Sequence, residues 1–171
     1  MTYIIGDVHG CFKTLQALIA KLPQEAHLIF VGDLIDRGTQ SADVVLFVRE
    51  KGYLCVLGNH EDAMITHGHN ILKAYEQGTL LHQHNVWYSN GGIETLLSYG
   101  VIQLIHGRPA KVDDFATPLK RFKEDIKWME SLPLFIELDL HVNNKPVVVS
   151  HGCIDTAWAF RKVDSMYTTL H

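Results

Sequence analysis

Three short apolar segments in the first third of the chain each lead into a glycine that is followed by polar residues. The segments are residues 3–5, 27–31 and 53–57, and the glycines are Gly6, Gly32 and Gly58. A continuous apolar run of this length, bounded by glycine, is typical of a buried strand. We therefore predict strands over residues 2–7, 27–31 and 53–57.

The segments between these strands have apolar residues at helical spacing. Residues 12–22 place apolar side chains on one face before Pro23, and residues 41–51 do the same before Gly52. The apolar positions are Leu15, Leu18, Ile19 and Leu22 in the first segment and Val44, Val45, Phe47 and Val48 in the second. Strands that alternate with helices in this way predict a parallel sheet with right-handed crossover connections.

Residues 62–132 show a weaker pattern that is mostly helical. Helices are predicted around residues 71–76, 92–98 and 119–129, and loops at residues 91–92 and 108–109. This segment is too long for a simple connection, so we interpret it as a helical cap inserted between strands.

A hairpin is predicted after the cap, because residues 134–138 and 146–149 are strand-like and flank residues 143–145. Its turn is expected to be longer than the tightest types, and residues 158–171 show no clear period. The overall prediction is a single α/β domain over residues 1–171, with a sheet core, flanking helices and the cap at residues 62–132.

Polar side chains follow each predicted strand. Because the carboxyl ends of parallel strands meet at one edge of a sheet, we expect these side chains to converge. Buried unpaired charge is costly, and a bound cation is the simplest partner for it. The candidate residues are Asp7 and His9 after the first strand, Asp33, Asp36 and Arg37 after the second, Asn59 and His60 after the third, and His151 after the hairpin.

Carboxylate and amide oxygens combined with imidazole suit manganese, iron or zinc, and manganese is our first choice. One arrangement that fits is two divalent ions about 3.5 Å apart that share one carboxylate. Such a pair binds phosphoryl oxygens, lowers the pKa of a water and stabilises the charge of an in-line displacement. In this interpretation Asp33 bridges the ions, Asp7 and His9 complete the first site, and Asn59 and His151 complete the second.

The remaining polar residues have the types needed for phosphate chemistry. Arg37 can hold two phosphoryl oxygens at once. His60 can protonate the leaving oxygen, and Asp36 can orient that imidazole. We therefore predict Asp36, Arg37 and His60 as catalytic residues, with Arg37, Asn59 and His60 in contact with the substrate.

Composition narrows the classes of partner. The chain has 171 residues, of which 47% are hydrophobic and 20% charged, and its net charge is −4. These values fit one globular domain and argue against a nucleic-acid or membrane-surface binder. Without a long apolar run, a signal peptide or paired cysteine spacing, the chain is expected to be cytoplasmic. The expected partner is a phosphorylated protein or a small phosphoester.

Three short motifs resemble the N-terminal signatures of the calcineurin-like metallophosphoesterases. They are GDVHG at residues 6–10, GDLIDRG at residues 32–38 and GNHE at residues 58–61. The aspartate-arginine pair and GNHE resemble the phosphoprotein phosphatase branch, in particular bacterial and phage enzymes of the lambda protein phosphatase type. Residues 87–92 resemble that group more weakly, and residues 149–152 resemble the next histidine motif of the family. The resemblance implies a two-metal phosphomonoesterase with a β-sandwich core.

The chain departs from the pattern of that family near its end. The family normally carries one more metal-binding histidine, in a Gly-His motif downstream of the position of His151, and a second phosphate-binding arginine. His171 lacks that context, and Arg161 is a candidate for the arginine. The resemblance therefore implies a truncated relative that lacks the last strands and binds the second ion more weakly than the first.

The favoured function is hydrolysis of phosphate monoesters, with phosphoserine or phosphothreonine in proteins as the first choice. One alternative is hydrolysis of dinucleoside tetraphosphates, although Asp36 favours the phosphatase branch. A second alternative is a catalytically inactive metal-binding module, since the last histidine and the second arginine are absent.

Other polar residues are given structural interpretations. The pairs at residues 67 and 69 and at residues 82 and 84 are interpreted as solvent-facing histidines of the cap rather than a further metal site. Cys11 and Cys153 are interpreted as small packing residues rather than oxidisable thiols. Glu61 is interpreted as a residue that favours the helix dipole, and Trp87 as core or cap packing.

Overall fold

The computed structural model describes residues 1–81, 85–152 and 168–170. Its first part alternates strands and helices, as the apolar pattern predicts. The elements are β1 (Thr2–Ile5), α1 (Phe12–Ile19), β2 (His27–Phe30), α2 (Ser41–Glu50) and β3 (Leu54–Cys55). The three strands form one sheet in the order β1-β2-β3, and both pairings are parallel.

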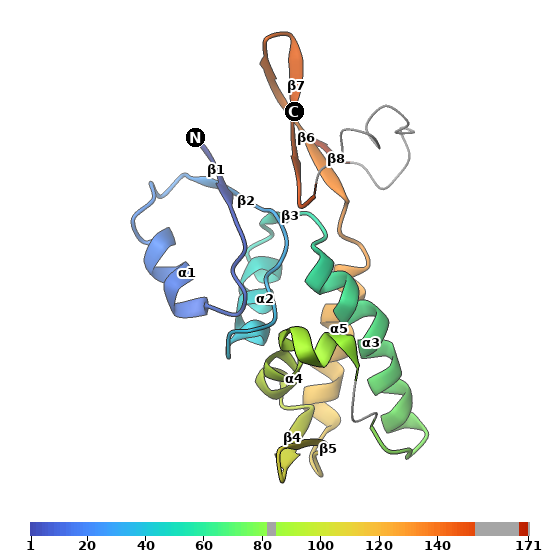
Figure 1. Ribbon diagram of the computed structural model, residues 1–171. Helices are drawn as coiled ribbons and strands as arrows, with labels where there is room; N and C mark the ends of the chain where they lie inside the picture. Colours follow the sequence, from blue (N-terminus) through green and yellow to red (C-terminus); the bar gives the residue numbers. More distant parts are fainter. Residues whose placement is uncertain (82–84, 153–167, 171) are drawn as a thin grey trace.

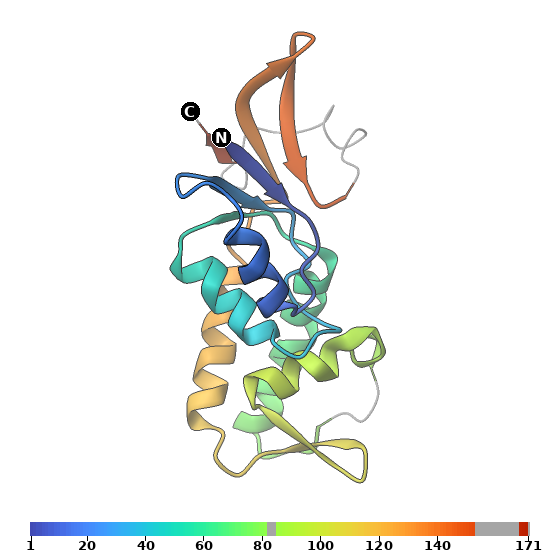
Figure 2. The same cartoon turned by 90° about the vertical axis from the view of Figure 1, so that its left-hand side faces the viewer.

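The second part contains the cap and a second sheet (Figure 1). Its elements are α3 (Asn59–Glu76), the π-helix η1 (Tyr88–Gly92), α4 (Ile93–Tyr99), β4 (Ile102–Ile105), β5 (Arg108–Lys111), α5 (Ala116–Met129), β6 (Phe135–Val142), β7 (Lys145–Ser150) and β8 (Thr168–Leu170). Strand β6 pairs with β7 in antiparallel and with β8 in parallel orientation. The β6–β7 hairpin and the β4–β5 hairpin lie at opposite ends of the molecule in both views (Figures 1 and 2).

The sheet β1-β2-β3 is covered on both faces, because successive residues of a strand point to opposite sides. Leu28 and Phe30 of β2 belong to the larger core, together with buried residues of α1 and α2. Ile29, between them, packs instead with Ile136 of β6 and Val149 of β7 in a second, smaller core. One face of the sheet is therefore covered by helices and the other by a second sheet, which confirms the predicted α/β class.

The cap is anchored to the first part by a buried polar cluster. Arg49 of α2 and Asp125 of α5 form an ion pair of 2.8 Å, and the hydroxyl of Tyr99 in α4 donates to Asp125 at 2.9 Å. Burial raises the pKa of the Asp125 carboxyl, while Tyr99 and Arg49 oppose this shift. Because breaking a buried pair is costly, this cluster fixes α4 and α5 against α2.

Two predictions about turns are wrong. Residues 108–109, predicted as a loop, are the first residues of β5. Among the described residues β5 pairs with β4 in a two-stranded sheet, where the missing N–H of Pro109 is tolerated. The β6–β7 turn is also tight: Asn143 and Asn144 both have left-handed φ values, 52° and 60°, and connect the paired residues Val142 and Lys145. This is the two-residue turn that matches strand twist. The pairing of β8 lies in a segment for which no element was predicted.

None of the helices among the described residues is both long and apolar enough to span a bilayer.

Candidate active site

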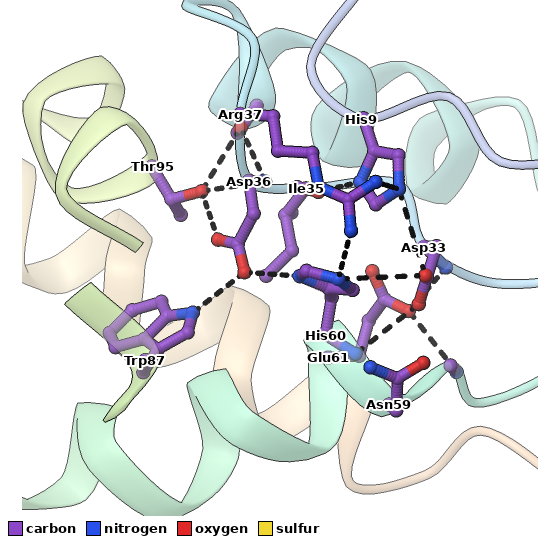
Figure 3. Close-up of polar contacts among 12 residues, drawn as sticks. His9, Asp33, Ile35, Asp36, Arg37, Asn59, His60, Glu61, Trp87 and Thr95 are labelled. Atoms are coloured by element: carbon purple, nitrogen blue, oxygen red, sulfur yellow. Dashed lines mark hydrogen bonds and ion pairs between the residues drawn. The ribbon is translucent and has the colours of Figure 1, made fainter. Parts of the chain in front are cut away.

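The loops that follow β1 and β2 are held together by backbone hydrogen bonds. The N–H groups of Val8 and His9 donate to the carbonyl of Asp33 at 3.0 and 2.9 Å, and that of Gly10 donates to the carbonyl of Leu34 at 2.8 Å. The third loop leads directly into α3, which begins at Asn59. The structure thus brings the polar residues of all three strand ends to one place (Figure 3).

Four of these loop residues have a backbone conformation that is rare outside glycine. The φ values of His9, Asp33, Asp36 and Arg37 are 45°, 51°, 71° and 66°. Left-handed backbone of this kind costs free energy in a residue with a Cβ, and it persists only where surrounding contacts fix it. The loops are therefore held in a strained form that directs these side chains toward one another.

Asp33 lies at the centre of the group. Its Oδ2 atom is 3.8 Å from Nε2 of His9 and 3.8 Å from Nε2 of His60, while its Oδ1 atom is 3.4 Å from Nε2 of His151. Asp7 lies on the His9 side, with Oδ2 3.8 Å from Nε2 of that ring. Asn59 lies on the other side, with Oδ1 2.8 Å from Nε2 of His151. One carboxylate therefore faces two groups of donor atoms.

The chemistry of these donors fits metal ions. His9 and His151 each donate from Nδ1–H to a backbone carbonyl, of Ile35 and Val31 respectively, at 2.8 Å. In a neutral ring the lone pair is then on Nε2, the atom that faces Asp33. Lone pairs gathered around a buried carboxylate favour a cation between them. The sets His9–Asp33–His60 and Asp7–Asp33–His151 each have candidate ligand atoms within 4.8 Å of one another. The predicted metal roles of these residues stay predictions.

Arg37 and His60 lie next to this group and contact each other. The guanidinium of Arg37 is exposed, with Nη1 2.8 Å from Nε2 of His9 and Nη2 3.3 Å from Nε2 of His60. The other nitrogen of His60, Nδ1, lies 2.6 Å from Oδ2 of Asp36. His60 is therefore oriented at one nitrogen by a carboxylate and presents the other nitrogen beside Arg37.

Asp36 is fully buried and held by a network that the sequence did not indicate. The indole N–H of Trp87 donates to Oδ2 at 2.8 Å, and the hydroxyl of Thr95 donates to Oδ1 at 2.7 Å. The backbone N–H of Asp36 points to the hydroxyl oxygens of Thr95 and Ser41, at 2.9 and 3.1 Å. Burial raises the pKa of the Asp36 carboxyl, and the bonds from Thr95, His60 and Trp87 oppose this shift.

Glu61 lies in the first turn of α3, as predicted, and its side chain is also a second internal acceptor that the sequence did not indicate. The side chain is fully buried, and its carboxylate accepts the backbone N–H groups of Asp33, Leu34 and Gly58 at 2.7, 2.8 and 3.1 Å. Burial raises the pKa of Glu61 to about 7, although these backbone donors oppose the shift. A Cβ on Gly58 would lie 2.4 Å from Oδ1 of Asp33, so the approach of this loop requires glycine. Glu61 thus connects the second and third loops.

Replacement of Glu61 by alanine is expected to lower the free energy of unfolding by about 3 kcal/mol or more, because three buried N–H donors would lose their acceptor. Urea unfolding followed by circular dichroism measures this change. Glu76→Ala, at the exposed end of the same helix, is the matched control and should change stability by less than about 0.5 kcal/mol. Equal stability of the two variants would contradict the connection that Glu61 makes between the second and third loops.

A family model described as calcineurin-like phosphoesterase matches residues 2–165. The chain belongs to this family. The predicted resemblance to metallophosphoesterases and the prediction of a phosphoesterase enzyme are therefore confirmed at the level of the family. The assignment to the lambda protein phosphatase type stays a prediction, because relatives of two kinds match this calcineurin-like phosphoesterase.

The relatives differ in their substrates. The symmetrical bis(5′-nucleosyl)-tetraphosphatase of Serratia proteamaculans (strain 568) is 49% identical over 65 residues, which cover 35% of this chain and 23% of that protein. Serine/threonine-protein phosphatase 1 of Salmonella typhimurium is 37% identical over 93 residues, which cover 53% of this chain and 38% of that protein. The chain therefore aligns with less than half the length of either relative. A solved structure of a protein proposed to be a diadenosine tetraphosphatase aligns at 20% identity and a TM-score of 0.40, covering 78% of this chain and 43% of that one.

Several other sequence predictions lie outside the site or outside the described residues. Cys11 is exposed, so its predicted role as a buried packing residue is wrong. The ring of His67 stacks on that of Trp87 at 6.2 Å, and His69 pairs with Glu130 at 2.7 Å. Neither belongs to a candidate metal cluster among the described residues. The candidates Arg161, Cys153, His82 and His84 lie outside the described residues.

Proposed function

We propose that the chain hydrolyses phosphate esters at the carboxyl edge of the β1-β2-β3 sheet. The observation that carries this proposal is the position of Asp33, whose two carboxylate oxygens face separate groups of donor atoms beside His60 and Arg37. An arrangement of this kind suits two cations that share one carboxylate.

The residues that would hold the first ion are Asp7, His9 and Asp33, and those for the second are Asp33, Asn59 and His151. Their mixture of oxygen and imidazole donors suits manganese, with iron or zinc as alternatives. When bound, such ions supply positive charge at the phosphoryl oxygens and lower the pKa of a water.

The side chains of this chain supply the remaining parts of the reaction. Arg37 presents two N–H groups from one guanidinium, which can hold two phosphoryl oxygens. His60 would carry a proton on Nε2 and donate it to the leaving oxygen when the ester bond breaks. Asp36 accepts from Nδ1 of that ring and so keeps Nε2 directed toward the substrate. This proton transfer would leave His60 neutral until it takes a proton from solvent.

Two substrate classes have support. A dinucleoside tetraphosphate is supported by the relative with the higher identity, and a phosphorylated protein by the relative whose alignment covers more of this chain. The presence of Asp36, which forms a hydrogen bond with His60, favours the phosphatase branch, because the sequence resemblance associates this aspartate with that branch. By relatives alone, the nucleotide substrate has at least as much support as the phosphoprotein.

A side-by-side assay tests the proposed function. With added manganese, the full chain is expected to hydrolyse p-nitrophenyl phosphate, and turnover should fall to background when a chelator removes the metal. Diadenosine tetraphosphate and a phosphoserine peptide assayed under the same conditions rank the two substrate classes. Absence of turnover with all three substrates would contradict the proposal and favour an inactive metal-binding module.

A further inference from the structure

A polar cavity of about 350 Å³ opens beside Arg37 on the side of the cap. Its walls come from the loop after β2, from η1 and from the first turn of α4, and they are Arg37, Tyr88, Ser89, Asn90, Gly91 and Glu94. The wall is fixed close to the site, because the backbone N–H of Arg37 points to the carbonyl of Gly91 at 3.4 Å. Gly91 has a φ of 104°, and a Cβ there would lie 2.3 Å from the nitrogen of Arg37. The cap therefore forms one side of the space that a substrate held by Arg37 would enter.

A second, larger cavity adjoins the first. It has a volume of about 550 Å³ and shares Tyr88 and Ser89 with the first cavity. Its other walls include the apolar side chains of Val86, Ile93 and Pro109, together with the turn of the β4–β5 hairpin. The two cavities thus form a groove that leads away from Arg37 and changes from polar to more apolar walls. We call this the cap groove.

The charges of the cap groove are unevenly distributed. In the first cavity, Arg37 is the one lining cation and Glu94 the one lining anion. The second cavity adds one exposed cation, Arg108, in the lining from the β4–β5 hairpin. No hydrogen bond or ion pair joins the Glu94 side chain to another residue in the part of the chain that the structure describes. A half-buried carboxylate without a partner disfavours further phosphate groups and favours a cation.

We propose that the cap groove binds the polypeptide next to a phosphorylated serine or threonine, with a lysine or arginine of the substrate beside Glu94. This inference rests on the proposed function, since it places the phosphoryl group at Arg37. An apolar side chain further along the substrate would pack against Val86, Ile93 and Pro109. A dinucleoside tetraphosphate fits the first cavity less well, because the phosphate next to the group held by Arg37 would lie beside the Glu94 carboxylate, and Arg108 lines only the second cavity.

The test uses two fluorescent phosphoserine peptides of equal length, one with lysines and one with glutamates on both sides of the phosphoserine. Fluorescence anisotropy gives their Kd values with the full chain in the presence of manganese. The lysine peptide is expected to bind about tenfold more tightly. The ratio of the two Kd values should fall close to one in Glu94→Gln, and the glutamate peptide should bind more tightly in Glu94→Lys. Glu76→Gln, a surface change on α3 outside the groove, should keep the preference of the unmodified chain.

Turnover of p-nitrophenyl phosphate, measured in parallel, separates this inference from the proposed function. Turnover without any difference between the two peptides would overturn the cap groove and leave the hydrolase intact. Tighter binding of diadenosine tetraphosphate than of the lysine peptide would also overturn it. A lysine preference that depends on Glu94 would support the groove even if turnover were absent, in which case only the hydrolase would fail.

Discussion

Replacement of Asp33 by asparagine is expected to lower kcat for p-nitrophenyl phosphate by roughly 10³-fold or more. The reason is that one side chain serves both groups of donor atoms: Oδ2 faces His9, and Oδ1 faces His151. The amide removes the negative charge from both groups at once. No other single substitution in the described site weakens both proposed ion sites directly.

Calorimetric titration with manganese tests the cause of this loss. The unmodified chain is expected to show one tight site and one weaker site, as the sequence resemblance implies, and Asp33→Asn should lose both. Asp139→Asn, an exposed change in β6, is the control and should leave both titration and turnover unaltered. Full turnover in Asp33→Asn would contradict the bridging role, and two tight sites in the unmodified chain would contradict the expected weak second site.

The strand ends of the site could be predicted because local sequence determines them. Each apolar run is short, ends in glycine and precedes a polar residue, so parallel pairing alone brings Asp7, Asp33 and Asn59 to one edge. For these residues, the period of the apolar pattern carries the necessary information. His151 follows β7, which lies in the second sheet and pairs antiparallel with β6, so its position depends on how the two sheets pack and not on parallel pairing.

The partners of Asp36 could not be predicted in the same way. Trp87 and Thr95 lie 51 and 59 residues further along the chain, in a cap whose periodicity is weak. A tryptophan or threonine that hydrogen-bonds to a buried carboxylate has the same local sequence as one that only packs. The weak family resemblance over residues 87–92 was the one sequence signal near Trp87 and Thr95, and it did not indicate that either residue contacts Asp36.

Glu61 shows that a residue with a predictable local role can also have a tertiary role. An acidic residue in the first turn of a helix is stabilised by the helix dipole, and this prediction requires no tertiary contact. Here the three N–H groups that it accepts belong to two different loops, so its role depends on how β2 and β3 pair. Tertiary contacts of this kind are absent from any local pattern.

The residues around the site explain how strained loops keep their shape. Asp36 and Arg37 have left-handed backbone, yet the N–H of Asp36 is held by Thr95 and Ser41, and that of Arg37 by Gly91. These partners come from α2, η1 and α4. The Arg49–Asp125–Tyr99 cluster fixes α4 and α5 against α2, and η1 leads directly into α4. Packing of the cap therefore contributes to the position of His60 through Asp36, at a distance from the reacting atoms.

Replacement of His60 by alanine is expected to lower kcat for p-nitrophenyl phosphate by about 10²–10⁴-fold, the range typical of a lost general acid. The loss should be larger for phenyl phosphate, because its leaving oxygen is more basic and depends more on a donated proton. Manganese binding at Asp7, His9 and Asp33 should persist, which separates this variant from Asp33→Asn in calorimetry.

His69→Ala, a change of an exposed histidine on the same helix, is the matched control and should retain full turnover. Equal losses for the two leaving groups would show that His60 acts by binding rather than by protonation, and undiminished turnover would remove it from the reaction altogether.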